Sequence, residues 1–495
     1  MAPDARRYGH HMKTSVIRRV GKNTISLAAM AVLTNLFIAA FTLFAIRMWG
    51  PEKFGGYSLV LAFSAFFMNF ATLGLDSIIR RDIPRDRGLS DSYMGNIFSI
   101  IVILSVLSIG IVWSLVELLD YPDALSRLIR LYSLTIVFNS LLTVLLTLIN
   151  AYERMEVTAA ITVFSTLLFS IGGFWLISQG HGVDTVLYLG VTVSFLTLLF
   201  TYLVVKRYFT KFHIQIDVGF CKDLIRMGLP YGIFTIFFIV HTRIDVFFLS
   251  KLGDVEAVGL YVPPIKVITF FGLLLMSFKS SVFPVMSQLY KTSRERFVVT
   301  VEQIVRMFML LTLPLTIILT VYSKGIVLLL FGPEYGGSSD VLIIGAWAFL
   351  LWGIADIIYI APLNSNKMMK FLPYELFYIT LNAGLNLMLI PKFGIVGAAF
   401  GTFVVMAISL LTDIILIRQY LSMRFKLVRL MYRPLLAGIT MSVPCILLEH
   451  STFSALMSLF AYVLTLVFTK EIGRGDINTI FELVGVKTVS SKNEG

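Results

Sequence analysis

The chain has 495 residues, of which 57% are hydrophobic and only 14% are charged. This composition excludes a water-soluble protein with a polar surface and indicates a polytopic membrane protein. The formal net charge of +12 could suggest a nucleic-acid partner, but the placement of Lys and Arg along the chain predicts none. The two cysteines, Cys221 and Cys445, offer no plausible disulfide framework, and the sequence predicts no metal site and no cofactor.

A helix needs about 20 apolar residues to cross a hydrocarbon core of about 30 Å. The sequence contains about fourteen such stretches, so we expect an all-α polytopic membrane protein with about 14 transmembrane helices. The last two stretches are short, and only residues 449–452 separate them. The fourteen expected spans are 24–46, 57–79, 95–119, 131–150, 157–178, 186–205, 228–250, 257–284, 306–323, 341–360, 372–390, 394–417, 434–449 and 453–469.

Most of the 41 Lys and Arg residues fall in alternate connections between these spans. Because cytoplasmic loops carry an excess of Lys and Arg, this asymmetry predicts that both termini are cytoplasmic. We expect a multi-pass protein of the plasma (inner) membrane. The basic tail is read as a topology signal, with binding of lipid headgroups as the alternative, and it does not resemble a cleaved signal peptide.

Two turns along the chain resemble each other and indicate an internal repeat. Trp49–Tyr57 and Leu252–Tyr261 each combine a glycine turn, an acidic residue and a Gly and Tyr at a helix start, about 203 residues apart. A second pair of similar segments, Leu148–Met155 and Pro362–Met369, has an offset of about 214 residues. Six spans per half predicts a parallel repeat, with the substrate path between the halves.

The repeat divides the chain into two six-helix bundles with two further helices. The expected parts are a cytoplasmic basic tail (1–23), an N-terminal six-helix bundle (24–205), a basic cytoplasmic linker (206–227), a C-terminal six-helix bundle (228–417), a basic loop with helices 13 and 14 (418–469) and a cytoplasmic tail (470–495).

The stretch from Gly228 to Pro284 contains charged residues inside two apolar spans. A charged side chain at bilayer depth costs at least about 2.5–3.5 kcal/mol on insertion scales, so it is expected to face a bundle interior or a water-filled cavity. Three cations in two neighbouring helices therefore predict a polar cavity that binds an anion. The charged residues are His241, Arg243, Asp245, Lys266 and Lys279.

Several segments resemble the polysaccharide transporter family, the Wzx-type oligosaccharide flippases of the multidrug/oligosaccharidyl-lipid/polysaccharide (MOP) superfamily. The resemblance covers nearly the whole chain, and its motifs, mostly turns, specify the superfamily better than the substrate. They are the first hairpin from Arg47 to Arg81 with its exit through Gly74-Leu75-Asp76 and Arg81-Asp82-Ile83, the stretch from Ile244-Asp245 to Gly259-Leu260-Tyr261, Phe331–Tyr335, and Asn386–Ala399.

The resemblance implies two six-helix bundles in a V that alternate between inward-open and outward-open states, with spans 1, 2, 7 and 8 lining a central cavity. It implies a transporter rather than an enzyme, whose substrate is a polyprenyl-diphosphate-linked oligosaccharide moved from the inner to the outer leaflet. Such a substrate needs cations for its diphosphate and polar groups for its sugars. The expected partners are this lipid-linked substrate and membrane lipids. We expect a monomer, near glycan-assembly enzymes.

Each candidate residue of the predicted cavity has a functional interpretation, and most have a structural alternative. Arg243 is the first choice for the diphosphate because its guanidinium can grip two phosphate oxygens; the alternatives are a pair with Asp245 or snorkelling to the interface. Lys266 lies too deep to reach the interface easily, whereas Lys279 has snorkelling as its alternative. The remaining candidates are the amides Asn35 and Asn69, which could contact sugar hydroxyls or join helices, and Arg47, an interfacial anchor or part of an outer gate.

A second group of residues is read as ion-coupling or gating, with H⁺ or Na⁺ as the coupling ion. His241 and Asp245 share a helix face, as residues four apart do, and form either a protonation switch or a satisfied pair. Asp76 and Asp356 could close the inner side by pairing with Arg80, Lys279 or Lys367, or they could be ordinary solvated residues at helix ends. In span eleven, Glu375, Asn382 and Asn386 form either a cation site or a packing surface. Asp413 is expected to face Arg418 or the headgroups.

Four functions are compatible with a polytopic membrane protein of this kind. The flippase is favoured by the cationic residues and by the absence of a Walker-type glycine loop from the sequence. A cation- or proton-coupled multidrug antiporter of the same superfamily would need an acidic N-terminal cavity, and a lipid II or teichoic-acid-precursor flippase would share the fold. A glycosyltransferase or polymerase would need a larger extracytoplasmic loop than residues 324–340 provide.

Overall fold

The structure is a computed structural model that describes residues 5–210, 212–363, 365, 367–447 and 452–469. Over these ranges the chain forms helices and no β-strand, so the prediction of an all-α fold is confirmed. Ten helical segments among them are long and apolar enough to cross a membrane. Each predicted span overlaps one of these helices or two consecutive ones; how many cross the membrane stays a prediction.

The chain divides into two compact units, residues 1–259 and 260–495. The first unit has a core of apolar side chains from α2, α3, α5 and α8, of which Ile79, Ile97 and Leu148 are fully buried. Its helices are α1 (Ala5–Thr72), α2 (Leu75–Asp82), α3 (Ser90–Leu118), α4 (Asp123–Tyr132), α5 (Thr135–Ala151), α6 (Met155–Ser178), α7 (Val183–Tyr208) and α8 (Val218–Leu252), with the short 3₁₀ helix η1 (Arg87–Leu89) before α3.

Glycines break the two longest helices where the sequence predicts turns. Helix α1 contains the first predicted span and most of the second, and Gly50 between them has φ 71° and ψ 177°. Glycine adopts a positive φ without steric cost, and the following Pro51 is suited to the first turn of the next helix. In the second unit Gly394 breaks α14 (Leu372–Leu421) with φ 55°.

The connection between α7 and α8 is attached to the first unit. The backbone N–H of Asp217 donates to Oδ1 of Asn96 at 2.8 Å, and Oγ of Ser99 donates to the carbonyl oxygen of Gln215 at 2.9 Å. Phe212, in the same connection, belongs to the apolar core of the first unit. Helix α8 begins at Val218, ten residues earlier than the span that hydropathy predicts. The segment expected to be a linker is therefore partly helical and partly core.

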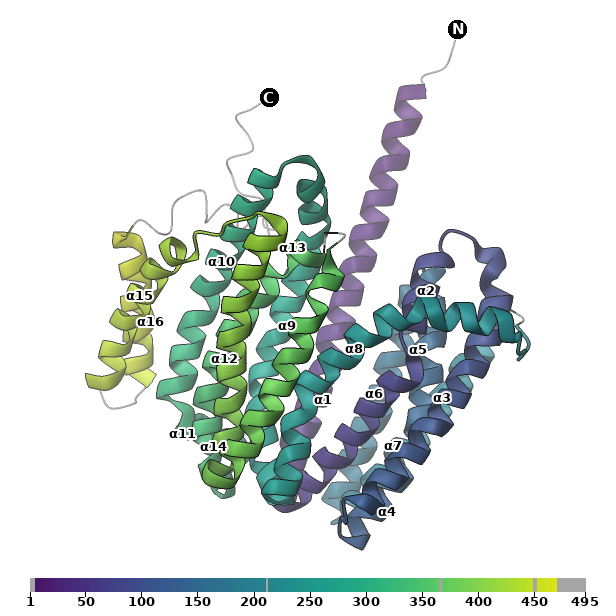
Figure 1. Cartoon of the computed structure of the whole chain (residues 1–495), viewed down its shortest axis with the longest axis horizontal. Helices are drawn as coiled ribbons and strands as arrows, with labels where there is room; N and C mark the ends of the chain where they lie inside the picture. Colours follow the sequence, from purple (N-terminus) through teal and green to yellow (C-terminus); the bar gives the residue numbers. More distant parts are fainter. Residues whose placement is uncertain (1–4, 211, 364, 366, 448–451, 470–495) are drawn as a thin grey trace. The chain divides into compact units, whose positions relative to one another are not determined.

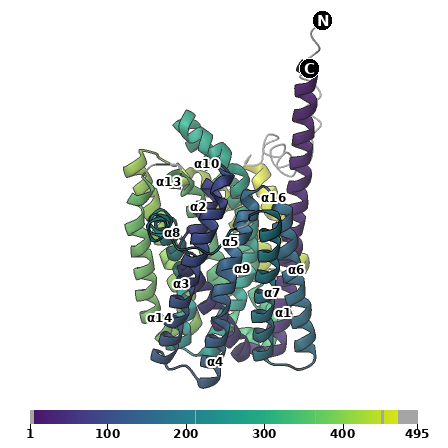
Figure 2. The ribbon, with the colours of Figure 1, turned by 90° about the vertical axis from the view of Figure 1, so that its right-hand side faces the viewer.

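Helix α8 packs against α1, α2 and α3; its place as the first helix of a C-terminal bundle stays a prediction. Its first part lies crosswise to α3, α5 and α7 (Figure 1), and Figure 2 shows this part end-on. Gly228 and Gly232 contact the break between α1 and α2, where Leu73 and Gly74 have positive φ. A Cβ added to Gly74 would lie 2.6 Å from the carbonyl oxygen of Gly228 and 2.5 Å from the nitrogen of Gly232. The two backbones touch, as small residues four apart permit between membrane helices.

The second unit contains most of α9 (Val255–Thr292) and the helices that follow it. Its core includes Phe297, Val305, Ile354 and Phe371, all at most 1% exposed. Helix α12 packs between α10 and α14, and α15 packs on α10 and α16. The elements are α10 (Arg294–Val321), α11 (Ser323–Phe331), η2 (Pro333–Ser338), α12 (Ser339–Ile358), α13 (Ile360–Leu363), η3 (Met368–Lys370), α14 (Leu372–Leu421), α15 (Leu427–Leu447) and α16 (Thr452–Phe468).

Candidate functional site

The charged residues of the seventh predicted span lie on α8, in the first unit. Arg243 is half-buried and makes no ion pair or hydrogen bond with any residue of the described part of the chain. The alternative pairing of Arg243 with Asp245 is therefore not formed. Asp245 is 7% exposed, and its charge acts on His241 one turn earlier. Helix α8 thus presents a buried carboxyl coupled to an imidazole and an arginine with no described partner.

The candidate residues of α1 differ in how they are engaged. Asn35 is half-buried. Nδ2 of Asn69 donates to the carbonyl oxygen of Ala65 in the preceding turn, at 2.8 Å. Arg47, three residues before the break at Gly50, is exposed. Of the two amides, Asn69 therefore has one of its two donor hydrogens occupied by its own helix.

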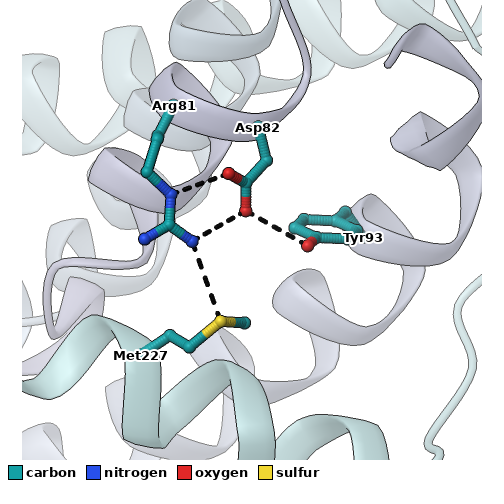
Figure 3. A network of polar contacts seen from close by, with 4 residues as sticks. All are labelled: Arg81, Asp82, Tyr93 and Met227. Atoms are coloured by element: carbon teal, nitrogen blue, oxygen red, sulfur yellow. Dashed lines mark hydrogen bonds and ion pairs between the residues drawn. The ribbon is translucent and has the colours of Figure 1, made fainter. Parts of the chain in front are cut away.

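A network of polar contacts joins three helices at the end of α2 (Figure 3). Nε and Nη2 of Arg81 donate to the two carboxylate oxygens of Asp82 at 2.7 and 2.9 Å. The hydroxyl of Tyr93 on α3 donates to Oδ2 of Asp82 at 3.2 Å, and Nη2 of Arg81 lies 3.7 Å from the sulfur of Met227 on α8. The network links α2 to α3 and α8, close to the contact of Gly74 with Gly228.

The guanidinium of Arg81 lowers the pKa of the Asp82 carboxyl below its ordinary value, chiefly through the two hydrogen bonds and then through its charge; Tyr93 and Arg85 contribute less in the same direction, and partial burial opposes them. The same carboxylate raises the pKa of Arg81. The side chains are 37% exposed for Arg81 and 16% for Asp82, so water screens part of this interaction. The pair is charged throughout the physiological range.

The nearby Asp76 forms a weaker pair. It lies 3.5 Å from Arg80, one turn along α2, and the Arg80 side chain is 72% exposed. This is one of the pairings considered for closing an inner gate. Within the structure it is a surface ion pair inside one helix, of the kind that contributes little to stability.

Three candidate residues of the central cavity and the inner gate belong to the second unit. Lys266 on α9 is exposed, and Asp356 on α12 is half-buried. The side chain of Lys279 lies outside those that the structure describes. These three residues belong to the second unit and Arg243 to the first, so a shared cavity remains a prediction.

Asp413 on α14 is buried and does not face Arg418 or the headgroups, in contrast to the sequence prediction. It is 5% exposed, and the hydroxyl of Tyr378 donates to its Oδ1 at 3.3 Å. The half-buried Glu375, also on α14, is near enough for its charge to act on Asp413. No ion pair of Asp413 with Arg418 or another described basic residue is formed. The carboxyl points inward because α14 folds back at Gly394 and brings Tyr378 beside it.

The two asparagines of span eleven join the two halves of α14. Both are fully buried. Nδ2 of Asn386 donates to Oδ1 of Asn382, and Nδ2 of Asn382 lies 3.4 Å from the hydroxyl of Thr402 beyond the break. These contacts correspond to the packing alternative. Across the described chain, no three His, Cys, Asp or Glu residues are grouped as metal ligands.

Sequence reasoning misses the network around Asp82 and the burial of Asp413. Arg81-Asp82 is visible as part of a motif, but the motif does not indicate which side chains the two residues contact. The partner Tyr93 is eleven residues away and Met227 is on a different helix, so no local spacing reveals the network. For Asp413, the only sequence signal is its position five residues before Arg418, which wrongly suggests a pair.

Two proteins linked by name to polysaccharide or glycan biosynthesis are similar to this chain. The capsular polysaccharide biosynthesis protein CapF of Staphylococcus aureus is 23% identical over 389 residues, covering 76% of this chain and 94% of CapF. The probable low-salt glycan biosynthesis flippase Agl15 of Haloferax volcanii is 25% identical over 270 residues, covering 54% of this chain and 56% of Agl15.

The fold is also known from solved structures. That of the lipid II flippase MurJ in an inward closed conformation superposes with a TM-score of 0.74 at 14% identity, over 93% of this chain and 99% of MurJ. The family model described as polysaccharide biosynthesis protein matches residues 20–290, more than half of the chain. The predicted resemblance to a polysaccharide family is confirmed at the level of this family model. The chain is a multi-pass membrane protein that belongs to the polysaccharide biosynthesis protein family.

Proposed function

We propose that the protein is a flippase that moves a polyprenyl-diphosphate-linked oligosaccharide from the inner to the outer leaflet of the plasma membrane by alternating access. The oligosaccharide and diphosphate pass through a polar cavity, and the polyprenyl chain stays in lipid. No step requires a catalytic residue. Membership of the polysaccharide biosynthesis protein family supports this proposal, as does the fold shared with a lipid II flippase.

The main structural support for this proposal is the position of Arg243. An arginine inside an apolar span is costly, and a carboxylate partner normally offsets that cost. Arg243 has none among the described residues, although Asp245 is only two positions away. Residues two apart on a helix point to different faces, which leaves the guanidinium available for a ligand. A diphosphate is a suitable one, because a guanidinium donates two parallel hydrogen bonds to phosphate oxygens.

The other cavity residues are proposed in supporting roles. Lys266 and Lys279 would add positive charge for the diphosphate, and Asn35 and Asn69 would contact sugar hydroxyls. Arg47 would act at the outer end of the cavity. The pair His241 and Asp245, together with Asp76, Asp356 and Glu375, are the candidates for coupling to H⁺ or Na⁺ or for gating. Both termini would be cytoplasmic, and the protein would act as a monomer near glycan-assembly enzymes.

The test measures movement of a short-chain lipid-linked oligosaccharide diphosphate across liposome membranes containing purified protein. The wild type is compared with Arg243→Ala, Arg243→Lys and the control Arg226→Ala, which removes an exposed cation from the same helix. We expect transport by the wild type and the control and at least a roughly tenfold loss in Arg243→Ala, since a charge-assisted hydrogen bond is worth about 1.5–3 kcal/mol. Arg243→Lys would retain charge without bidentate geometry and fall between them.

The same liposomes separate the competing functions. Exchange of a cationic drug without movement of the lipid-linked substrate, with or without proton and sodium gradients, would make the protein an antiporter and refute the proposal. Movement of lipid II in place of the oligosaccharide lipid would retain the mechanism and change the substrate. Full activity of Arg243→Ala would show that the cation has a structural role only.

A further inference from the structure

The connection between α7 and α8 contacts α3 through polar groups. Asn96 and Ser99 of α3 form hydrogen bonds with its backbone. The side chain of Gln215 lies against Gly95 of α3: a Cβ added to Gly95 would be 2.8 Å from Cγ of Gln215 and 3.1 Å from its Nε2. One side of this segment is therefore held against the first unit.

The other side of the segment is apolar and open. Polar and apolar residues alternate from His213 to Val218, and Asp217 has an extended backbone with φ −94° and ψ 106°. Alternate side chains of an extended chain lie on opposite sides. Ile214, Ile216 and Val218 are 67%, 63% and 76% exposed; we call these three residues the apolar edge. The polar side thus faces the protein and the apolar edge faces outward, the reverse of what water favours.

The level of the apolar edge in the membrane follows from its attachment. It lies between the predicted spans 186–205 and 228–250, where bilayer lipid is not expected to cover it. Gly95 and Ser99, which hold the segment, are at the start of the predicted span 95–119. The first part of α8 follows the segment and lies crosswise to α3, α5 and α7 (Figure 1), along the plane of a membrane that these helices are predicted to cross. The apolar edge is therefore at the membrane–water boundary.

The residues on both sides of the apolar edge complement negative charge. Tyr208, at the end of α7, is 72% exposed, and tyrosine favours the membrane–water boundary. Of the two acidic residues in this stretch, Asp217 caps α8 by accepting a hydrogen bond from the N–H of Phe220 at 3.0 Å, and Asp223 is exposed. The exposed cations that flank the apolar edge are Lys206, Arg207 and Lys222.

We propose that the apolar edge is a lipid-binding surface on the side predicted to be cytoplasmic. Ile214, Ile216 and Val218 insert at the boundary of the inner leaflet, and the flanking cations bind the headgroups of anionic lipids. Membrane-surface segments bind by this combination of apolar insertion and attraction to anionic lipid. The lipid covers a surface that the protein leaves open and holds the connection against α3. The inference depends on the predicted topology and not on the transported substrate.

Quenchers attached to lipid test the position of the apolar edge in the full chain. An environment-sensitive fluorophore is attached through Ile216→Cys or, as the control in the same segment, through the exposed His213→Cys, with Cys221 and Cys445 changed to Ser. The protein is placed in vesicles of phosphatidylcholine and phosphatidylglycerol, part of which carries bromine on the acyl chains. We expect severalfold stronger quenching at residue 216 than at residue 213.

The composition of the vesicles tests the anionic headgroup. Quenching at residue 216 should increase with the fraction of phosphatidylglycerol. One cation near an anionic surface strengthens binding by about fivefold, so Lys222→Gln should raise the fraction needed for half-maximal quenching by up to about fivefold. The control Lys324→Gln removes an exposed cation of the second unit and should leave that fraction unchanged.

Three results would overturn the proposal. Equally weak quenching at both residues would place the apolar edge in water. Strong quenching that is unchanged in phosphatidylcholine alone would exclude the anionic headgroup. Weak quenching together with disulfide-linked dimers of the Ile216→Cys chain would mean that a second copy covers the edge. Because the measurement involves no transport, its failure is separate from failure of the proposed flippase.

Discussion

Replacement of Asp82 by Asn tests whether the network at the end of α2 stabilises the first unit. The carboxylate accepts two hydrogen bonds from Arg81 and one from Tyr93. Asparagine keeps one acceptor oxygen in nearly the same place but loses the charge and the second acceptor. Arg81 would then keep its contact with Met227 and lose its bidentate partner, so the links from α2 to both neighbouring helices are weakened together.

The expected loss is intermediate in size. Hydrogen bonds to charged groups contribute about 1.5–3 kcal/mol each when shielded, whereas exposed ion pairs contribute about 0–1 kcal/mol. With Arg81 at 37% and Asp82 at 16% exposure, the network lies between these limits. We expect Asp82→Asn to lower the free energy of unfolding by about 1–2 kcal/mol, or to lower the midpoint by about 2–4 °C for each kcal/mol in a unit of this size.

The effect should also have a defined pH dependence. The pKa of Asp82 is lowered in the folded protein, so its contribution is present above the pKa of an unfolded Asp, about 3.9, and is lost as the pH falls through the lower folded value. The stability difference between wild type and Asp82→Asn should therefore stay constant from about pH 8 to pH 5 and shrink only below about pH 4.

Thermal unfolding in detergent, followed by the fluorescence of a thiol dye or of tryptophan, measures both effects. The matched control is Asp76→Asn, which removes the exposed pair with Arg80 on the same helix and should cost less than about 0.5 kcal/mol. Equal stabilities of Asp82→Asn and wild type would refute the reasoning, as would a difference between them that already disappears at pH 6.

Two further predictions concern packing inside each unit, at Gly232 in the first and at Asp413 in the second. Gly232→Ala would place a Cβ 2.7 Å from the backbone of Leu73 and should destabilise the protein by about 1–3 kcal/mol. The control Gly219→Ala, whose Cβ would lie 3.4 Å from the Asp217 carboxylate, should have little effect. Equal unfolding temperatures of the two variants would show that the helices separate without cost. Asp413→Leu should lower the free energy of unfolding by about 1–3 kcal/mol because it leaves the buried Tyr378 hydroxyl without its acceptor. Asp413→Asn should lower it less, because the amide oxygen can still accept this hydrogen bond. The opposite order of unfolding temperatures would contradict the assignment of the bond.

Features that depend on local chemistry were predictable from the sequence. The turn at Gly50-Pro51 combines the residue that adopts positive φ with the residue preferred at a helix start. At Gly394 a glycine with positive φ again breaks the helix, with Pro391 three residues before it. The span positions follow from the length of apolar residues that a membrane requires. The internal repeat was also visible, because the same turn chemistry occurs twice.

Features that depend on which helices meet were not predictable. Hydropathy places the start of the seventh span at residue 228, because Lys222, Asp223 and Arg226 interrupt the apolar pattern, yet α8 begins at Val218. Whether Asp413 faces lipid headgroups or a tyrosine depends on the rotation of α14 about its axis, which one acidic residue near a span end does not specify. The Asp82 network forms only where α2, α3 and α8 meet, and no local sequence pattern indicates that these helices are neighbours.

The attachment of the connection before α8 affects where the chain can be divided. Phe212 and Leu224 are part of the apolar core of the first unit, so a fragment ending after α7 would expose the surface they cover. During synthesis, the first unit cannot complete its core until these residues have left the ribosome. If the protein is expressed as two separate polypeptides, the cut that preserves a folded first partner therefore falls after α8, and not in the polar segment that hydropathy marks as the boundary.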